Sequence, residues 1–213
     1  MRTDDWIDFL STAAPAVQRA GLYRRWSVGL SGGVGLALLL VVTAYGLRPD
    51  LLGLYGEPML WIKFAFPASV ALGASVAVWR LGHPGTPLGR SWWVVLVAFG
   101  AIWLLAAWTW LDTPAERQGL ALWGNTWRTC APSIAAVSMP VFVGGFWALR
   151  GMAPTRPGLA GAAIGLLAGG AGALVYALHC PEMSPVFVAV WNTLGIVIPT
   201  ALGAYWGPRL LRW

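Results

Sequence analysis

Charged side chains are scarce in this sequence: Asp, Glu, Lys and Arg together make up 10% of its 213 residues. A soluble domain carries about 25% charged residues, because water must wet its surface. With 58% hydrophobic residues and a mean hydropathy of +0.66, this chain cannot cover a water-facing surface of ordinary size. The composition excludes an ordinary soluble domain and predicts that lipid surrounds most of the chain.

Clusters of basic residues and catalytic motifs are also missing. The formal net charge is +6, yet the 14 basic residues occur singly or in pairs. A nucleic-acid-binding surface would need a basic stripe or patch. The sequence contains no carboxylate pair, Ser-His-Asp set, phosphate-binding loop or nucleotide motif. We therefore expect no direct binding of nucleic acid, no enzyme activity and no cofactor.

Long apolar runs dominate what is present. Six of them have about the 20 residues that a helix needs to cross the hydrocarbon core of a membrane. They cover residues 26–46, 59–79, 92–111, 131–149, 158–178 and 185–207. The sequence predicts an all-α integral membrane bundle of six transmembrane helices over residues 26–213, preceded by a segment at 1–25. Residues 112–129 are expected to form an amphipathic helix along the membrane surface.

The basic residues predict the orientation, because Lys and Arg are retained on the cytoplasmic side of membranes. Ten of them fall on the side of the N-terminus. These are Arg2, Arg19, Arg24, Arg25, Arg80, Arg90, Arg150, Arg156, Arg209 and Arg212. Four fall on the other side, which is slightly acidic: Arg48, Arg117, Arg128 and Lys63, the last of these just inside the second run. Both termini are therefore expected in the cytoplasm.

The two cysteines both lie where apolar runs meet the extracytoplasmic side. Cys130 is expected at the N-terminal end of the fourth helix, close to Arg128, where the helix dipole favours a thiolate. Cys180 follows the fifth helix, where the dipole disfavours a thiolate, although His179 could offset this. We expect Cys130 to react first and Cys180 to resolve it as a disulfide. A permanent structural disulfide and two inert thiols remain alternatives. A single adjacent His–Cys pair supplies too few ligands for a zinc site, so no metal is expected.

The N-terminal segment reads MRTDDWIDFL and predicts a short helix. Thr3 can cap it, and Asp4 and Asp5 then occupy its first turn, where the dipole favours carboxylates. Its apolar face comprises Trp6, Ile7, Phe9 and Leu10. Membrane-surface helices are usually basic, so this acidic helix suits a partner with a basic rim around an apolar groove. The alternative is a solvated tail.

Three glycines in the fifth run, Gly161, Gly165 and Gly169, are spaced by four residues. On a helix this spacing places them on one face, where a neighbouring backbone can come close. We interpret the three glycines as a helix-packing face.

Several motifs together resemble one known family. They are MRTDDWIDFL, GLRPDLL at 46–52, the cysteine before the fourth helix, ALHCPEMSPVFVAVWNTLGI from residue 177 and the final LLRW. In this order and spacing the sequence is similar to the NrsF-type anti-sigma factors. It departs from them at Cys130, which follows Trp127, Arg128 and Thr129, whereas members often have Ser-Trp-x-Cys.

The resemblance implies a six-helix protein of the bacterial inner membrane. It implies that the N-terminal segment, with Asp4, Asp5, Trp6 and Leu10, binds an extracytoplasmic-function sigma factor and keeps it from RNA polymerase. Cys130 and Cys180 are implied to sense oxidants or thiol-reactive metals and to release the sigma factor. The oligomeric state stays open, and a homo-oligomer is one alternative.

Two other functions compete with this one. A small transporter or channel would need polar groups inside the membrane, and the main ones deep in a run are Asn192 and Thr200. A membrane thiol oxidoreductase would normally have a CxxC pair or a quinone pocket, and the sequence indicates neither.

Overall fold

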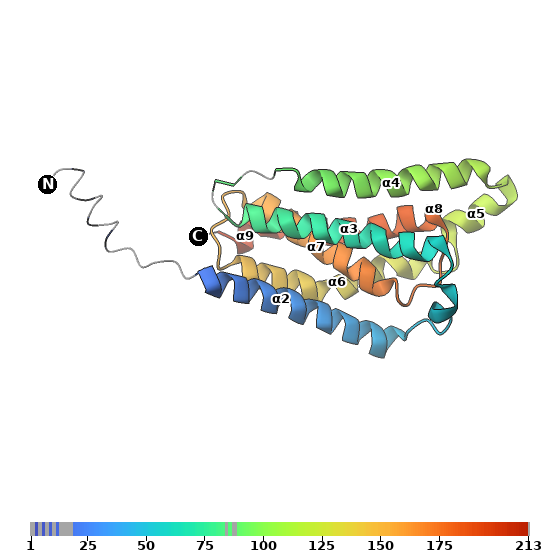
Figure 1. Cartoon of the computed structure of the whole chain (residues 1–213), viewed down its shortest axis with the longest axis horizontal. Coiled ribbons are helices and arrows are strands. Elements are labelled where there is room, and N and C mark those ends of the chain that lie inside the picture. The colour runs from blue at the N-terminus through green and yellow to red at the C-terminus, as the bar shows by residue number, and fades with distance from the viewer. Residues whose placement is uncertain are drawn as a thin grey trace.

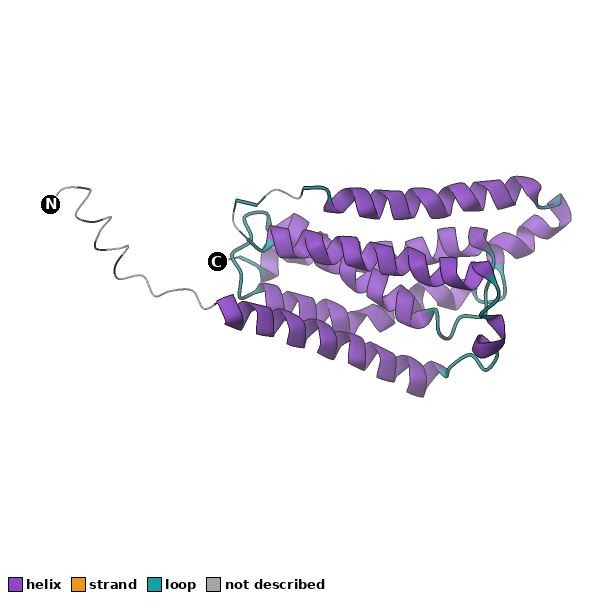
Figure 2. Cartoon of the chain, in the orientation of Figure 1, coloured by secondary structure: helices purple, strands orange, loops and turns teal. Residues whose placement is uncertain are grey.

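The computed structural model describes residues 3, 6, 9, 12, 19–83, 85, 86 and 89–212. These residues form helices joined by short connections, and Figure 2 shows no strand among them. The expectation of an all-α fold is confirmed. Six helices are long and apolar enough to cross a membrane: Gly21–Tyr45, Pro58–Leu81, Ser91–Asp112, Ala115–Leu149, Pro157–Tyr176 and Pro185–Leu210.

The six spans and the connections between them contain several distinct elements. In chain order these are α2 (Arg19–Leu40), the π-helical η1 (Val41–Tyr45), the 3₁₀-helical η2 (Leu51–Leu54), α3 (Pro58–Leu81), α4 (Ser91–Asp112), α5 (Ala115–Trp123), α6 (Trp127–Leu149), α7 (Pro157–Tyr176), α8 (Pro185–Phe187), the π-helical η3 (Val188–Asn192) and α9 (Thr193–Leu210). Helices α3, α7 and α8 each begin at a proline, which suits the first helical position because its missing N–H would have no partner there. The helix expected within residues 112–129 is α5.

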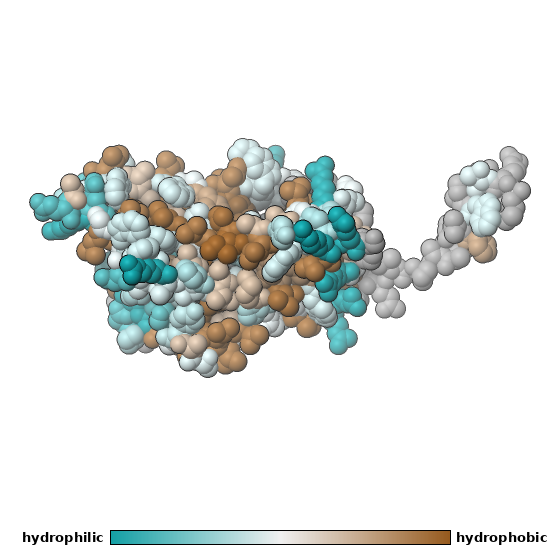
Figure 3. All heavy atoms as spheres, turned by 180° about the vertical axis from the view of Figure 1, so that it is seen from behind, coloured by the Kyte–Doolittle hydropathy of each residue, from teal (hydrophilic) through white to brown (hydrophobic). Residues whose placement is uncertain are grey.

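The spans run alternately up and down, so α2 begins and α9 ends at the same end of the bundle (Figure 1). We call this the basic end. Its arginines are Arg24, Arg25, Arg80, Arg90, Arg150, Arg156, Arg209 and Arg212. The opposite end, which we call the cysteine end, carries η2, α5 and residues 177–184. Figure 3 shows hydrophilic side chains toward the two ends of one face and apolar side chains between them.

Helix α7 forms the centre of the bundle, since 72% of its apolar window is buried. It packs against α9, α3 and α6. The face with Gly161, Gly165 and Gly169 lies against α9, and a Cβ at Gly161 or Gly165 would overlap the α9 backbone at Gly203 or Pro199. These glycines therefore allow two backbones to approach more closely than any side chain would permit.

Helices α2 and α6 pack in the same way. A Cβ on Gly29 would lie 2.6 Å from the carbonyl oxygen of Gly144, and one on Gly33 would lie 2.8 Å from the Cα of Val141. At the basic end, the guanidinium of Arg25 lies 5.9 Å from the centroid of the Trp147 ring. The helix that follows the N-terminal segment is thus packed along the helix that contains Cys130.

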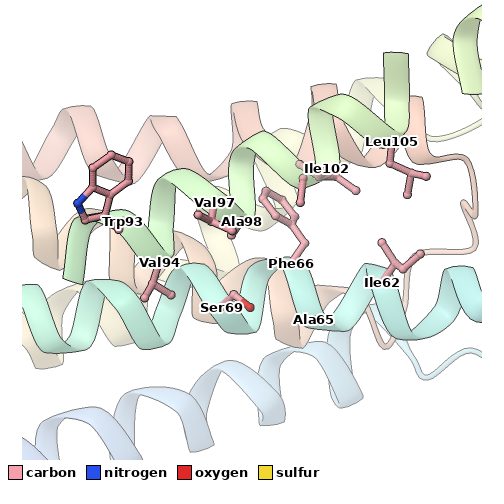
Figure 4. Close-up of a pocket in the computed structure, with 11 residues that line it drawn as sticks. Ile62, Ala65, Phe66, Ser69, Trp93, Val94, Val97, Ala98, Ile102 and Leu105 are labelled. Carbon is pink, nitrogen blue, oxygen red and sulfur yellow. The ribbon is translucent and has the colours of Figure 1, made fainter. Parts of the chain in front are cut away.

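Helix α4 lies at the edge of the bundle (Figure 1), and only 17% of its apolar window is buried. An apolar groove of about 630 Å³ separates it from α3. Phe66 and Ile102 line the groove, and Ser69 is one of its few polar side chains (Figure 4). A ligand site usually combines an apolar wall with several convergent polar groups. This groove lacks the convergent polar groups of a ligand site.

Candidate functional site

Residues 177–184, between α7 and α8, form the most heavily hydrogen-bonded part of the cysteine end, and we call them the HCPE loop. Arg48, from the GLRPDLL motif, donates its backbone N–H to Leu178 O (3.1 Å) and its Nη1 to Pro181 O (3.0 Å). Two further bonds, of 2.6 and 2.8 Å, join its guanidinium to Asp50 and lower the pKa of that exposed carboxyl. The GLRPDLL motif and the HCPE loop therefore contact each other.

His179 belongs to the same set of contacts. Its Nδ1 lies 3.0 Å from Gly46 O, and its ring packs against the rings of Tyr45 and Tyr176. The side chain that was expected to assist Cys180 thus joins the HCPE loop to the end of η1.

Lys63 of α3 is directed into the loop. Its side chain is 1% exposed, and its Nζ donates to Cys180 O (2.5 Å) and Glu182 O (2.8 Å). The sequence suggested only a basic residue near a helix end, useful for orientation. Lys63 is instead a buried cation that holds two carbonyls of the loop. One signal could have identified it: it is the only lysine in the chain, and the other 13 basic residues are arginines.

The Glu182 side chain lies at the N-terminus of α6. Its Oε1 accepts the backbone N–H of Asn125 (2.7 Å) and the hydroxyl of Thr126 (3.3 Å). A carboxylate at this position pairs with a backbone amide just before the helix and also complements the helix dipole. Gly124 makes the approach possible, since it has φ +50° and its Cβ would lie 2.7 Å from the carboxylate.

Helix α5 is joined to the same region through its last turn. The Ser184 hydroxyl donates to Ala121 O and the Trp191 indole donates to Leu122 O, both at 2.8 Å. The ring of Trp191 also packs against Trp123. The short helix expected along the membrane surface is therefore held by the HCPE loop and by η3.

The structure brings the two cysteines together although 50 residues separate them in the sequence. Cys130, in the first turn of α6, is 0% exposed and Cys180 is 2% exposed, and both are free thiols. The Cys130 thiol lies 3.6 Å from Asn192 Oδ1 and is hydrogen-bonded to the Cys180 sulfur. Asn192, which the sequence indicates only as a polar group deep in an apolar run, is the last residue of the π-helical turn η3. Among the described residues no three His, Cys, Asp or Glu side chains gather into a metal-binding group.

The environment favours a thiolate at Cys180. The pKa of this thiol is lowered to about 6, first by the hydrogen bond from Cys130. The charge of Lys63, the backbone N–H of Glu182 and a hydrogen bond from Lys63 lower it further, while burial opposes them. This order of reactivity differs from the expectation that Cys130 would be the nucleophile. The reason is that Lys63 of α3 and the backbone N–H of Glu182 lie beside Cys180, whereas the expectation weighs helix dipoles alone.

Within residues 1–18 the structure describes four positions, Thr3, Trp6, Phe9 and Thr12. Thr3, Trp6 and Phe9 have helical backbone and exposed side chains. The rings of Trp6 and Phe9 meet edge to face with centroids 6.3 Å apart. Asp4, Asp5, Ile7 and Leu10 lie outside the described residues.

Comparison with known proteins gives a consistent result. A family model described as "Negative regulator of sigma F" matches residues 10–213. The chain is 41% identical over 214 residues to the anti-sigma-F factor NrsF of Caulobacter vibrioides (strain NA1000 / CB15N). It is 39% identical over 218 residues to the probable anti-sigma-F factor NrsF of Azospira oryzae (strain ATCC BAA-33 / DSM 13638 / PS). Each alignment covers 100% of both chains. No solved structure matches. The chain belongs to the NrsF family of anti-sigma factors, negative regulators of sigma F whose role is regulatory and not enzymatic.

Proposed function

We propose that this anti-sigma factor spans the bacterial inner membrane and binds an extracytoplasmic-function sigma factor through residues 1–25. Oxidation or modification of Cys130 and Cys180, outside the cytoplasm, releases the sigma factor. One observation carries the proposal. A buried, hydrogen-bonded thiol pair lies at the end of the bundle opposite to the end where α2 begins.

The charge distribution supports the orientation. The basic end holds eight arginines, two of which, Arg24 and Arg25, lie near the start of α2, and the cysteine end holds Lys63 and three arginines beside several carboxylates. Lys and Arg are retained on the cytoplasmic side, so the basic end faces the cytoplasm. The cysteines then face an oxidising compartment, where thiols meet external oxidants before they meet cytosolic reductants.

The exposed aromatic side chains of the N-terminal segment support the binding site. Trp6 is 49% exposed and Phe9 is 61% exposed. Aromatic side chains are the usual anchors of protein interfaces, and they are most effective when a partner buries them in a pocket. The aspartates beside them in the sequence suit a basic rim on the sigma factor.

The chemistry can be written for a hydroperoxide as the oxidant. The Cys180 thiolate attacks the peroxide, the O–O bond breaks, and Cys180 becomes a sulfenic acid while an alkoxide leaves. The Cys130 thiol then condenses with the sulfenic acid, which forms the disulfide and releases water.

The packing of α2 on α6 supports a route to the other end of the bundle. Disulfide closure shifts the first turn of α6, and α6 touches α2 at Gly29 and Gly33. The sigma factor is released when the two states of the bundle differ in their affinity for it. A coupling of this kind requires two discrete arrangements of packed helices.

The test is co-purification of the full chain with the extracytoplasmic-function sigma factors of its own genome, before and after treatment with an oxidant. We expect the wild type to bind one sigma factor and to release it on oxidation. Deletion of residues 1–20 should abolish binding, whereas Cys130→Ser with Cys180→Ser should bind normally and lose the response. Release by oxidant from the serine variant would refute the redox role, and binding after the deletion would refute the role of the N-terminal segment.

A further inference from the structure

We infer that Lys63 is the counter-ion of Cys180, and that oxidation, by removing the negative charge of the sulfur, weakens the hold of Lys63 on the HCPE loop. This inference rests on the proposed redox function and explains how a change at two sulfur atoms becomes a change of structure.

The geometry of Lys63 carries the inference. Its ammonium is buried and donates to the neutral carbonyls of Cys180 and Glu182. A buried charge is costly unless an opposite charge lies close to it. The nearby carboxylates are engaged elsewhere, since Asp50 is paired with Arg48 and Glu182 caps α6. The remaining group that can be negative is the sulfur of Cys180, whose charge interacts favourably with that of Lys63.

The choice of residue supports the same conclusion. Every other basic residue in the chain is arginine, which cannot be deprotonated in a protein. The only lysine occupies the one buried cationic position among the described residues. Lysine can give up its proton when its surroundings change, so the residue type fits a cation whose partner disappears.

The oxidation balances with Lys63 as the proton donor. The thiolate of Cys180, the ammonium of Lys63, the thiol of Cys130 and one hydroperoxide give the disulfide, a neutral Lys63 amine, one alcohol and one water. The alkoxide that leaves the peroxide takes its proton from Lys63. Before the reaction, two charge-assisted hydrogen bonds hold Cys180 O and Glu182 O. Afterwards these bonds are between neutral groups and are weaker, or Lys63 moves to water.

The HCPE loop can pass this change to the helices. Glu182 holds the N-terminus of α6, and the loop also contacts α5 and the GLRPDLL segment. When Lys63 releases the loop from α3, these contacts move with it. Lys63 is therefore a positioning residue, acting through Cys180 and the loop.

The first experiment measures thiol alkylation in the full-length purified chain. Iodoacetamide is used over a range of pH, and mass spectrometry maps the modification at each cysteine. The ionisable groups that face Cys180 are Lys63, Cys130, Glu182, Arg48 and Tyr176. We expect wild-type Cys180 to react before Cys130, with a midpoint near its pKa of about 6. In Lys63→Met the midpoint should rise, and the rate at neutral pH should fall by on the order of tenfold.

Two matched variants separate charge from structure. Lys63→Arg keeps the charge and should keep the low midpoint. Arg48→Gln removes a different side-chain tether of the same loop, at Pro181 O, and should raise the midpoint of Cys180 less than Lys63→Met does. An unchanged midpoint in Lys63→Met, or an equal shift in Arg48→Gln, would overturn the inference.

The second experiment uses the wild type alone, so it does not depend on the folding of a variant. Lys63 is the only lysine, so its acetylation by acetic anhydride can be mapped without ambiguity in the reduced and disulfide forms. We expect faster acetylation in the disulfide form, since the amine is then neutral or exposed. Equal rates would contradict the inference. Neither experiment involves a sigma factor, so their failure is distinguishable from failure of the proposed function.

Discussion

Glu182 connects two helices through one residue. Its carboxylate accepts hydrogen bonds from Asn125 and Thr126 at the start of α6, and its backbone carbonyl accepts one from Lys63 of α3. A side-chain substitution removes the first contact and leaves the second. This separation allows the cap to be tested without disturbing the lysine.

Glu182→Ala should lower the free energy of unfolding by about 1 kcal/mol, the usual cost of a lost helix cap. Thermal unfolding of the purified chain measures the loss. Glu57→Ala is the matched control, because Glu57 occupies the N-cap position of α3 but its side chain makes no capping bond. Equal destabilisation by the two variants would contradict a capping role for Glu182.

At the level of single residues, the sequence indicates the cysteines and not their surroundings. His179 and Cys180 are adjacent and Cys130 stands apart, in a chain that has only two cysteines and two histidines. The sequence alone therefore indicates these three residues. The roles of Lys63 and Arg48 could not be predicted, since each acts on a loop more than 100 residues further along the chain. The predicted order of thiol reactivity has the same basis, because it weighs local helix dipoles and leaves out Lys63 of α3.

Glycine faces determine how closely the helices pack. In α7, a Cβ on Gly165 would overlap the backbone of α9 at Pro199, whereas Gly100 in α4 has nothing within 4 Å of the position where its Cβ would stand. The two glycines therefore offer a direct comparison of the same substitution.

Gly165→Ala should destabilise the chain by on the order of 1 to 3 kcal/mol, since the helices must move apart. Gly100→Ala should be neutral or slightly stabilising, by up to about 1 kcal/mol, because alanine favours the helix. Thermal unfolding under identical detergent conditions compares them. If both variants unfolded at the same temperature, close packing at Gly165 would not matter.

Coupling between α2 and α6 can be tested in the same way. Gly29→Ala places a methyl group 2.6 Å from Gly144 O, whereas Gly32→Ala on the same helix meets nothing within 4 Å. We expect Gly29→Ala to change the oxidant dose that releases the sigma factor, measured by co-purification, and Gly32→Ala to leave it unchanged. Identical dose responses in the two variants would remove the α2–α6 contact from the proposed route.

At the level of elements, hydropathy predicts the spans well and their ends less well. The first apolar run begins at residue 26, but α2 begins at Arg19. A helix can extend beyond an apolar run through charged residues, and hydropathy does not detect such an extension. The π-helical turn that positions Asn192 has no signal in the apolar run from residue 185. The glycine spacing in α7 predicts a close contact with another helix but does not identify which one. The pairing with α9 depends on packing in three dimensions.

At the level of the whole molecule, the two ends of the bundle differ in charge, and this difference predicts the orientation. In a chain with both cysteines replaced by serine, a single cysteine at Gly53 or at Thr155 reports each end, since both positions are exposed. An impermeant maleimide applied to intact spheroplasts should label Gly53→Cys and spare Thr155→Cys until the membrane is opened. The reverse pattern would place the thiol pair in the cytoplasm.

Burial of the two sulfur atoms also determines which reagents the chain can detect. Cys130 is 0% exposed and Cys180 is 2% exposed. A folded protein that must bind at the surface of the chain therefore cannot bring its reactive group to either sulfur atom. Thiol-oxidising enzymes and bulky mixed disulfides are therefore kept out, and only compact diffusible molecules reach the pair. Under the proposed redox function, the pair would therefore respond to small oxidants and not to the disulfides of other proteins.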